Sequence, residues 1–209
     1  AEYTGPHDRP LRKYPEVALT IAAVGSAYEN GYKVTASHEG TNPYSGWEAF
    51  DANGDLVGWH SNDGSGSVIA YNGTDGLYSG TTRLATETEL GEWLGLELPE
   101  AIKLIDVQLV SQDYGPAVNT IDNFIVYAKK QPGDTWTSLG VFTGKAVFQT
   151  SAAGVTVTVN AVDYYKFFAI VATKRNGGGT NTGVSIRDLA FYGHEEGDSS
   201  LDTTLKSVY

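Results

Sequence analysis

The sequence predicts an all-β protein, built as an antiparallel sandwich or jelly roll. Apolar and polar residues alternate with a period of two in several short segments, which is typical of strands with one buried face. Turns rich in Gly and Asp separate these segments. No segment has the spacing of an amphipathic helix. Many short strands joined by such turns favour a two-layer β fold over the 209 residues of the chain.

Strands are expected where β-branched and aromatic residues alternate with polar ones, or where apolar residues follow one another without a break. The first pattern predicts half-buried strands and the second predicts strands covered on both faces. The segments are 31–37, 103–110 and 155–159 for the first pattern, and 124–127 and 167–171 for the second.

Three other segments lack this periodicity. Residues 1–15 hold three prolines and predict an extended N-terminal arm, because proline lacks the amide donor and disfavours helix before it. Residues 61–80 form a long polar excursion, and excursions of this length are usually functional or mobile. Residues 194–209 predict a linker or the start of a following domain, which leaves 16–193 as the β-sandwich.

The composition argues against several classes of partner. There is no cysteine, so neither a disulfide framework nor a thiolate metal site is possible. The formal charge of −11 repels phosphates and anionic lipids, which disfavours nucleic acid and membrane partners. No apolar run is long enough for membrane insertion. Neutral sugars, metal cations and other proteins remain. Because methionine is absent as well, the chain is expected to be a processed or excised part of a larger protein.

The stretch from Gly46 to Asp55 carries the densest group of oxygen donors. Asp51, Asn53 and Asp55 lie between Trp47 and Trp59. Calcium binds six to eight oxygens from carboxylates, amides and carbonyls, so an acidic turn between aromatic anchors favours a calcium site. The same residues are also those that ordinary turns prefer. The sequence leaves both interpretations open.

Six segments, in order along the chain, together resemble the discoidin family, which is also known as the coagulation factor type C domains and is similar to family 32 carbohydrate-binding modules. The segments are Val34-Thr35-Ala36-Ser37; Trp47-Glu48-Ala49-Phe50-Asp51-Ala52-Asn53 with Trp59; Gly91-Glu92-Trp93-Leu94-Gly95-Leu96-Glu97-Leu98-Pro99; Phe124-Ile125-Val126-Tyr127 with Thr135-Trp136-Thr137-Ser138-Leu139; Tyr165-Lys166-Phe167-Phe168; and Asp188-Leu189-Ala190-Phe191-Tyr192-Gly193. The resemblance implies an eight-stranded jelly-roll sandwich whose loops bind ligand at one end.

The resemblance also implies a structural calcium ion at the acidic stretch. Its ligands would be Asp51, Asn53 and Asp188, with backbone carbonyls near Ala49 and Val57. Asp188 stands where the family more often has Glu, and Val57 where it often has Thr. Both changes remove or shorten a donor. The gap between Trp59 and Trp93 is longer than usual in the family, and this insertion would reshape or cover the ligand end.

Sugar sites combine a stacking aromatic ring with planar hydrogen-bonding groups, because a pyranose has an apolar C–H face and a rim of hydroxyls. Loop residues of these types are the candidates for ligand binding, since loops on a rigid scaffold concentrate binding residues. The candidates are His38, Tyr44, His60, Tyr114, Asn119, Arg175 and Asn176. The tryptophans lie within the segments of the resemblance, so they are expected to pack in the core.

No nucleophile motif, no zinc-binding His-Glu-x-x-His and no thiol appears, so no catalytic site is predicted. The leading hypothesis is a non-catalytic carbohydrate-recognition module with structural calcium, acting in adhesion as part of a larger extracellular, cell-surface or virion-surface protein. Its partners would be glycans of a cell surface or polysaccharide and the neighbouring domains of its parent protein. One alternative is a structural or assembly domain of an adhesin, virion fibre or capsid that binds no free sugar. A jelly-roll enzyme acting on glycans is the other.

Overall fold

The computed structural model describes residues 11–20, 27–40, 44–52, 57–61, 70–111, 119–145, 154–176 and 183–196. In these ranges the chain forms eleven strands and one short 3-10 helix, η2 (Gly46–Phe50). All strand pairings are antiparallel. The expected all-β class and each of the five expected strands are confirmed, while the number of strands exceeds the eight implied by the resemblance.

The first layer is a sheet in which β5 lies between β3 and β9, with β2 beyond β3 and β6 and β7 beyond β9. Alternate residues of these strands point to opposite faces, so the period of two in the sequence becomes one core face and one outer face. The bounds are β2 (Ala27–Glu29), β3 (Tyr32–Ala36), β5 (Glu92–Val110), β6 (Ile121–Lys129), β7 (Thr137–Phe142) and β9 (Tyr165–Arg175).

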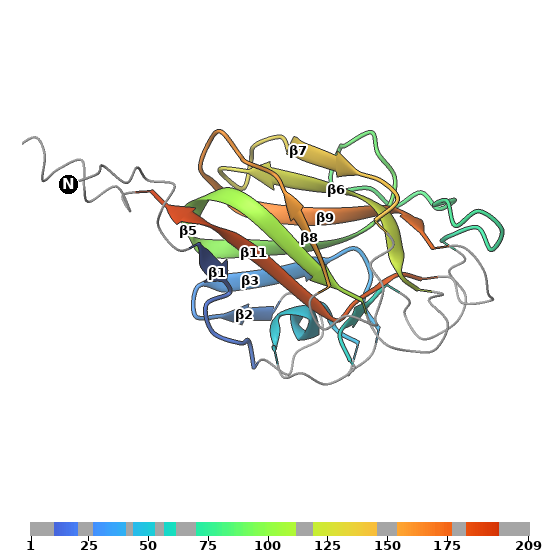
Figure 1. Ribbon diagram of the computed structural model, residues 1–209, viewed down its shortest axis with the longest axis horizontal. Coiled ribbons are helices and arrows are strands. Elements are labelled where there is room, and N and C mark those ends of the chain that lie inside the picture. Colours follow the sequence, from blue (N-terminus) through green and yellow to red (C-terminus); the bar gives the residue numbers. More distant parts are fainter. Residues whose placement is uncertain are drawn as a thin grey trace, which may run out of the picture.

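The second layer uses the other half of β5. Residues up to Glu97 pair with β3 and β9, and Ile102 still pairs with Tyr165 of β9. Residues from Ile102 onward pair with β11 along one edge and, from Asp106, with β8 along the other. The pairing shifts between Glu97 and Ile102, around Pro99, and the green ribbon of β5 folds back there at the left of Figure 1. This layer contains β1 (Arg12–Tyr14), β8 (Val155–Thr158) and β11 (Asp188–Glu195).

The core lies between the two layers. It joins inward residues of the first layer, such as Leu94, Phe124 and Phe168, to Val107 and Phe191 of the second. The rings of Phe168 and Phe191 lie 5.2 Å apart, which is contact distance for aromatic pairs. A smaller apolar cluster covers the outer face of the first layer, and Trp93 and Trp136 pack against it while partly buried. Of the predicted core tryptophans, Trp59 lies in the core at 1% exposure, whereas these two lie on the outer face.

The chain ends differ from the predicted boundaries. Residues 12–14 of the expected arm are strand β1, paired with β11, and the Tyr14 side chain is 1% exposed. At the other end β11 continues past Gly193 to Glu195, which accepts a hydrogen bond from the Tyr14 hydroxyl at 2.9 Å. Both short segments belong to the sandwich because their pairing completes its second layer. Residues 1–10 and 197–209 lie outside the described residues.

The two short strands β4 (Trp59–His60) and β10 (Ser185–Ile186) pair with each other. They lie near the end where β9 finishes and β6 begins, because Ser185 N donates to Asn119 O and Asn176 N donates to Thr120 O. We call this end of the sandwich the loop end. No helix in the described part of the chain is long and apolar enough to span a membrane.

Candidate functional site

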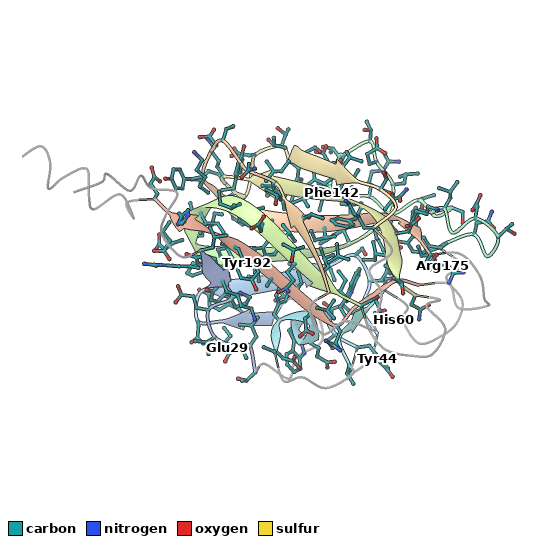
Figure 2. The ribbon with its side chains drawn as sticks, in the orientation of Figure 1. Glu29, Tyr44, His60, Phe142, Arg175 and Tyr192 are labelled. Atoms are coloured by element: carbon teal, nitrogen blue, oxygen red, sulfur yellow. The ribbon has the colours of Figure 1, made fainter. Side chains whose placement is uncertain are left out.

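The loop end collects most of the predicted ligand-binding residues. Figure 2 shows Tyr44, His60 and Arg175 at the same end of the molecule. The backbone holds them together: His60 N donates to Tyr44 O at 3.2 Å, and Gly40 N donates to His60 O at 3.0 Å. Tyr114, also predicted, lies outside the described residues.

His60 and Asn119 form the centre of this group. Asn119 Nδ2 lies 3.0 Å from His60 Nε2, and burial lowers the pKa of His60 to about 4, so the imidazole is neutral at physiological pH. A neutral ring with Nε2 accepting from the amide carries its proton on Nδ1. The Tyr44 ring packs edge-on against this imidazole, with 6.1 Å between ring centroids.

Two buried polar atoms beside His60 have no hydrogen-bond partner among the residues that the structure describes. They are Oδ1 of Asn119, which is 8% exposed, and Oγ of Ser185, which is 2% exposed. Ser185 is opposite His60 in the β4–β10 pair. Buried polar groups are nearly always bonded, and an unbonded one points to a missing water or ligand. The loop end therefore has hydrogen-bonding capacity that the described protein atoms do not use.

Ser185 was missed at the level of sequence. It is a small polar residue between Val184 and Ile186, and this alternation also fits an ordinary strand with one wet face. The only available signal was its position just before the segment Asp188 to Gly193.

Arg175 lies at the loop end but is closed off from solvent. Its residue exposure is 0%, and the end of the 61–80 excursion covers it. Gly76 packs directly against the Arg175 backbone, and Arg175 N donates to Gly76 O at 2.9 Å. Burial lowers the pKa of Arg175, and the nearby Tyr71 opposes that shift. A ligand would reach this guanidinium only if the covering segment moved. Asn176, the next residue, is partly exposed.

A second polar cluster, also missed from the sequence, surrounds Glu92. This side chain is fully buried at the start of β5. Its Oε2 lies 2.6 Å from Ser37 Oγ and 2.7 Å from His38 Nδ1, and its Oε1 accepts from the Tyr78 hydroxyl at 2.8 Å. Tyr71 donates to Ala172 O nearby and accepts from Glu92 N. The described excursion residues thus attach to the sandwich by buried polar contacts.

The predicted calcium ligands that the structure describes lie around η2. Ala49, Ala52 and Asp188 line one cavity of about 250 Å³ between η2 and β11. Gly58 packs against Ile186 and Arg187, which brings Val57 toward the same place, while Asp51 follows η2 directly. Asn53 is outside the described residues. The donors fit calcium in kind, although Arg187 Nε donates to Asp188 Oδ2 at 2.7 Å and already balances part of that charge.

The described polar cluster around Glu92 differs from a catalytic triad of serine, histidine and carboxylate. The Ser37 hydroxyl contacts Glu92 and not His38, so His38 is not placed to take the Ser37 proton as the histidine of such a triad does. Neutral amide, hydroxyl and imidazole groups at the loop end instead match the hydroxyl rim of an uncharged polar ligand.

Comparison with known proteins places the fold. No protein-family model matches the chain, and no curated protein matches its sequence. The fold is similar to that of the family 32 carbohydrate-binding module of Clostridium perfringens NanJ in complex with galactose, with a TM-score of 0.52 and 17% identity over 78% of this chain and 93% of that one.

Two further solved structures agree. The C. perfringens module CpGH89CBM32-5, in complex with GalNAc-β-1,3-galactose, has a TM-score of 0.52 and 14% identity over 77% of this chain and 94% of that one. An F5/8 type C domain from Bacteroides fragilis has a TM-score of 0.52 and 13% identity over 82% of this chain and 97% of that one. The chain therefore has the sandwich fold of discoidin domains and family 32 modules, as the resemblance implied.

Proposed function

Starting from this shared fold, we propose that the protein is a non-catalytic carbohydrate-recognition module that binds neutral glycans at its loop end. The observation that carries the proposal is the pair of buried, unbonded atoms, Asn119 Oδ1 and Ser185 Oγ, beside the neutral imidazole of His60. Both atoms are closed off from solvent, so a sugar hydroxyl, which both donates and accepts hydrogen bonds, would satisfy them after a local opening of the loop end. The partly exposed Tyr44 ring supplies an apolar surface nearby.

The two carbohydrate-binding neighbours are named with galactose and GalNAc-β-1,3-galactose, and these sugars are the first probes. We expect titration calorimetry to detect binding of at least one of them. Asn119→Ala and Ser185→Ala should each weaken binding about threefold to tenfold, because a net hydrogen bond contributes about 1 kcal/mol.

Thr158→Ala is the matched control, because Thr158 is an exposed residue of β8, the edge strand that pairs with β5 in the second layer. Its affinity should equal that of the unsubstituted protein. The proposal is contradicted if no neutral saccharide binds on a glycan array and if the same saccharides produce no heat in calorimetry and no chemical-shift change in NMR. That result would favour the alternative, a structural or assembly domain of a surface protein that binds no free sugar.

The role implied by such a site is adhesion outside the cell, as one module of a larger protein. A glycan ligand on a cell surface or in a polysaccharide fits the acidic charge of the chain, which disfavours phosphate-rich partners.

We further propose that calcium binds at η2, with Asp51, Asn53, Asp188 and the carbonyls of Ala49 and Val57 as ligands. An ion that binds only the folded state raises its stability by mass action, so chelator should lower the melting temperature. Asp51→Ala should abolish that dependence. Asp163→Ala, which removes an exposed partner of Lys130, should keep it. Identical melting curves with excess calcium and excess chelator would leave only the turn interpretation.

A further inference from the structure

The cluster around Glu92 fixes the proton positions of its neighbours. Trp93 N donates to Ser37 Oγ at 2.9 Å, so the Ser37 proton is directed to Glu92 Oε2 at 2.6 Å. In the same way Thr82 N donates to the Tyr78 oxygen at 3.2 Å, and the Tyr78 proton goes to Glu92 Oε1. Both carboxylate oxygens are therefore acceptors. Burial raises the pKa of Tyr78 to about 12, so this hydroxyl keeps its proton.

His38 must then donate to Glu92. Its Nδ1 lies 2.7 Å from Oε2, and an acceptor at that oxygen requires the proton to be on Nδ1. In the neutral ring Nε2 is left with a lone pair, on the side of the imidazole away from the buried carboxylate. The His38 side chain is 39% exposed, whereas Glu92 is fully buried, so the accepting nitrogen belongs to the accessible half of this pair.

The pair lies next to the proposed sugar site. The His38 carbonyl accepts from Trp59 Nε1 at 2.7 Å, and Trp59 immediately precedes His60. Gly40, two residues after His38, donates its backbone N–H to His60 O. The segment 37–40 therefore runs beside β4, and the two imidazoles come from adjacent backbone segments.

We propose that His38 contacts the ligand of the loop end as a hydrogen-bond acceptor, and that Glu92 is the positioning residue that holds its tautomer and ring orientation. This inference rests on the proposed sugar-binding function and narrows its ligand class. A lone pair backed by a buried carboxylate attracts O–H and N–H donors and repels anions. The site therefore selects neutral glycans with an accessible hydroxyl over sugars that carry a carboxylate.

The test uses the whole chain with galactose and galacturonic acid as probes. Galactose should bind more tightly than galacturonic acid. His38→Ala should weaken galactose binding about fivefold, the equivalent of one net hydrogen bond. His194→Ala is the matched control, because His194 lies on β11 at the opposite end of the sandwich. This variant should bind galactose as tightly as the unsubstituted protein does.

Glu92→Gln tests positioning separately from stability. Imidazole nitrogen shifts measured by NMR should report the Nδ1–H tautomer of His38 in the unsubstituted protein and a mixture of tautomers in Glu92→Gln. If Glu92→Gln does not fold, the half-exposed His38→Ala variant still provides the affinity readout.

The outcomes separate the two proposals. If galactose binds and His38→Ala binds equally well, or if galacturonic acid binds as tightly as galactose, this inference is wrong and the sugar site stands. An Nε2–H tautomer in the unsubstituted protein also overturns it. If the unsubstituted protein binds no neutral saccharide, the proposed function fails, and the role of His38 fails with it.

Discussion

The partly buried imidazole of His60 predicts a specific loss of stability in acid. In the folded chain burial lowers its pKa to about 4, against 6.5 for an ordinary histidine. Between these two values the unfolded chain binds a proton that the folded chain rejects. The contribution of His60 to the free energy of unfolding is therefore fully present above about pH 6.5, and it is lost as the pH decreases toward 4. At about 1.4 kcal/mol for each pH unit, the gap amounts to about 3 kcal/mol.

The measurement is the free energy of unfolding by denaturant, taken at several pH values between about 7.5 and 4. Carboxylates titrate in the same range, so the change must be isolated by difference. His60→Gln supplies that reference, because its side-chain amide can accept from Asn119 Nδ2 but does not titrate. The stability of the unsubstituted protein minus that of His60→Gln should fall by about 3 kcal/mol across this range.

Parallel stability curves for the two proteins would refute the reasoning. So would an NMR titration of the His60 ring with a midpoint near its ordinary value. Either result would mean that water or a partner reaches the ring in the folded state and that burial does not control its charge.

Two further predictions concern packing. Gly91→Ala should destabilise the protein by about 1–3 kcal/mol, because the new methyl group would meet the Ala172 carbonyl of β9. Gly133→Ala, with open space around it, should change the stability little. Equal melting temperatures for the two variants would contradict this prediction. Phe168→Ala should lower the free energy of unfolding by about 3–5 kcal/mol, because Phe168 is fully buried against Phe191. Val162→Ala, at an 86% exposed position, should be nearly neutral. A loss below about 1 kcal/mol for Phe168→Ala would show that the core is loosely packed around Phe168.

The sequence predicts the strands well because apolar and polar residues alternate with a period of two along each half-buried strand. It does not predict the course of β5. Pro99 looks like the end of a strand, since proline cannot complete a central ladder. In the structure Pro99 lies at the corner where the strand leaves one layer for the other, between Glu97 and Ile102, so no ladder bond is required of it.

The candidate site was predictable in part. His60 and Asn119 were expected on loops, and the structure brings their side chains within hydrogen-bond distance. The burial of Arg175 was not predictable, because it depends on how Gly76 of the excursion packs on the end of β9. Glu92 was hidden for a similar reason: a carboxylate at the start of a strand normally faces water, and only the tertiary structure supplies its three donors. Such contacts join residues that are far apart in the sequence, so no local pattern predicts them.

The pairing of β1 with β11 determines how the module responds to a pulling force. The start of β1 lies beside the last part of β11, because the two strands are antiparallel neighbours with Arg12 opposite Gly193. Figure 1 shows β1 at the left of the molecule, and Figure 2 shows His60 and Arg175 at the right. Tension between the start of β1 and the end of β11 would peel β1 from β11 one hydrogen bond at a time, as a zipper opens. It would not shear all the bonds at once. The second layer would therefore open at its edge under low load, while the loop end, anchored by β5 and β9 in the first layer, would keep its geometry longest.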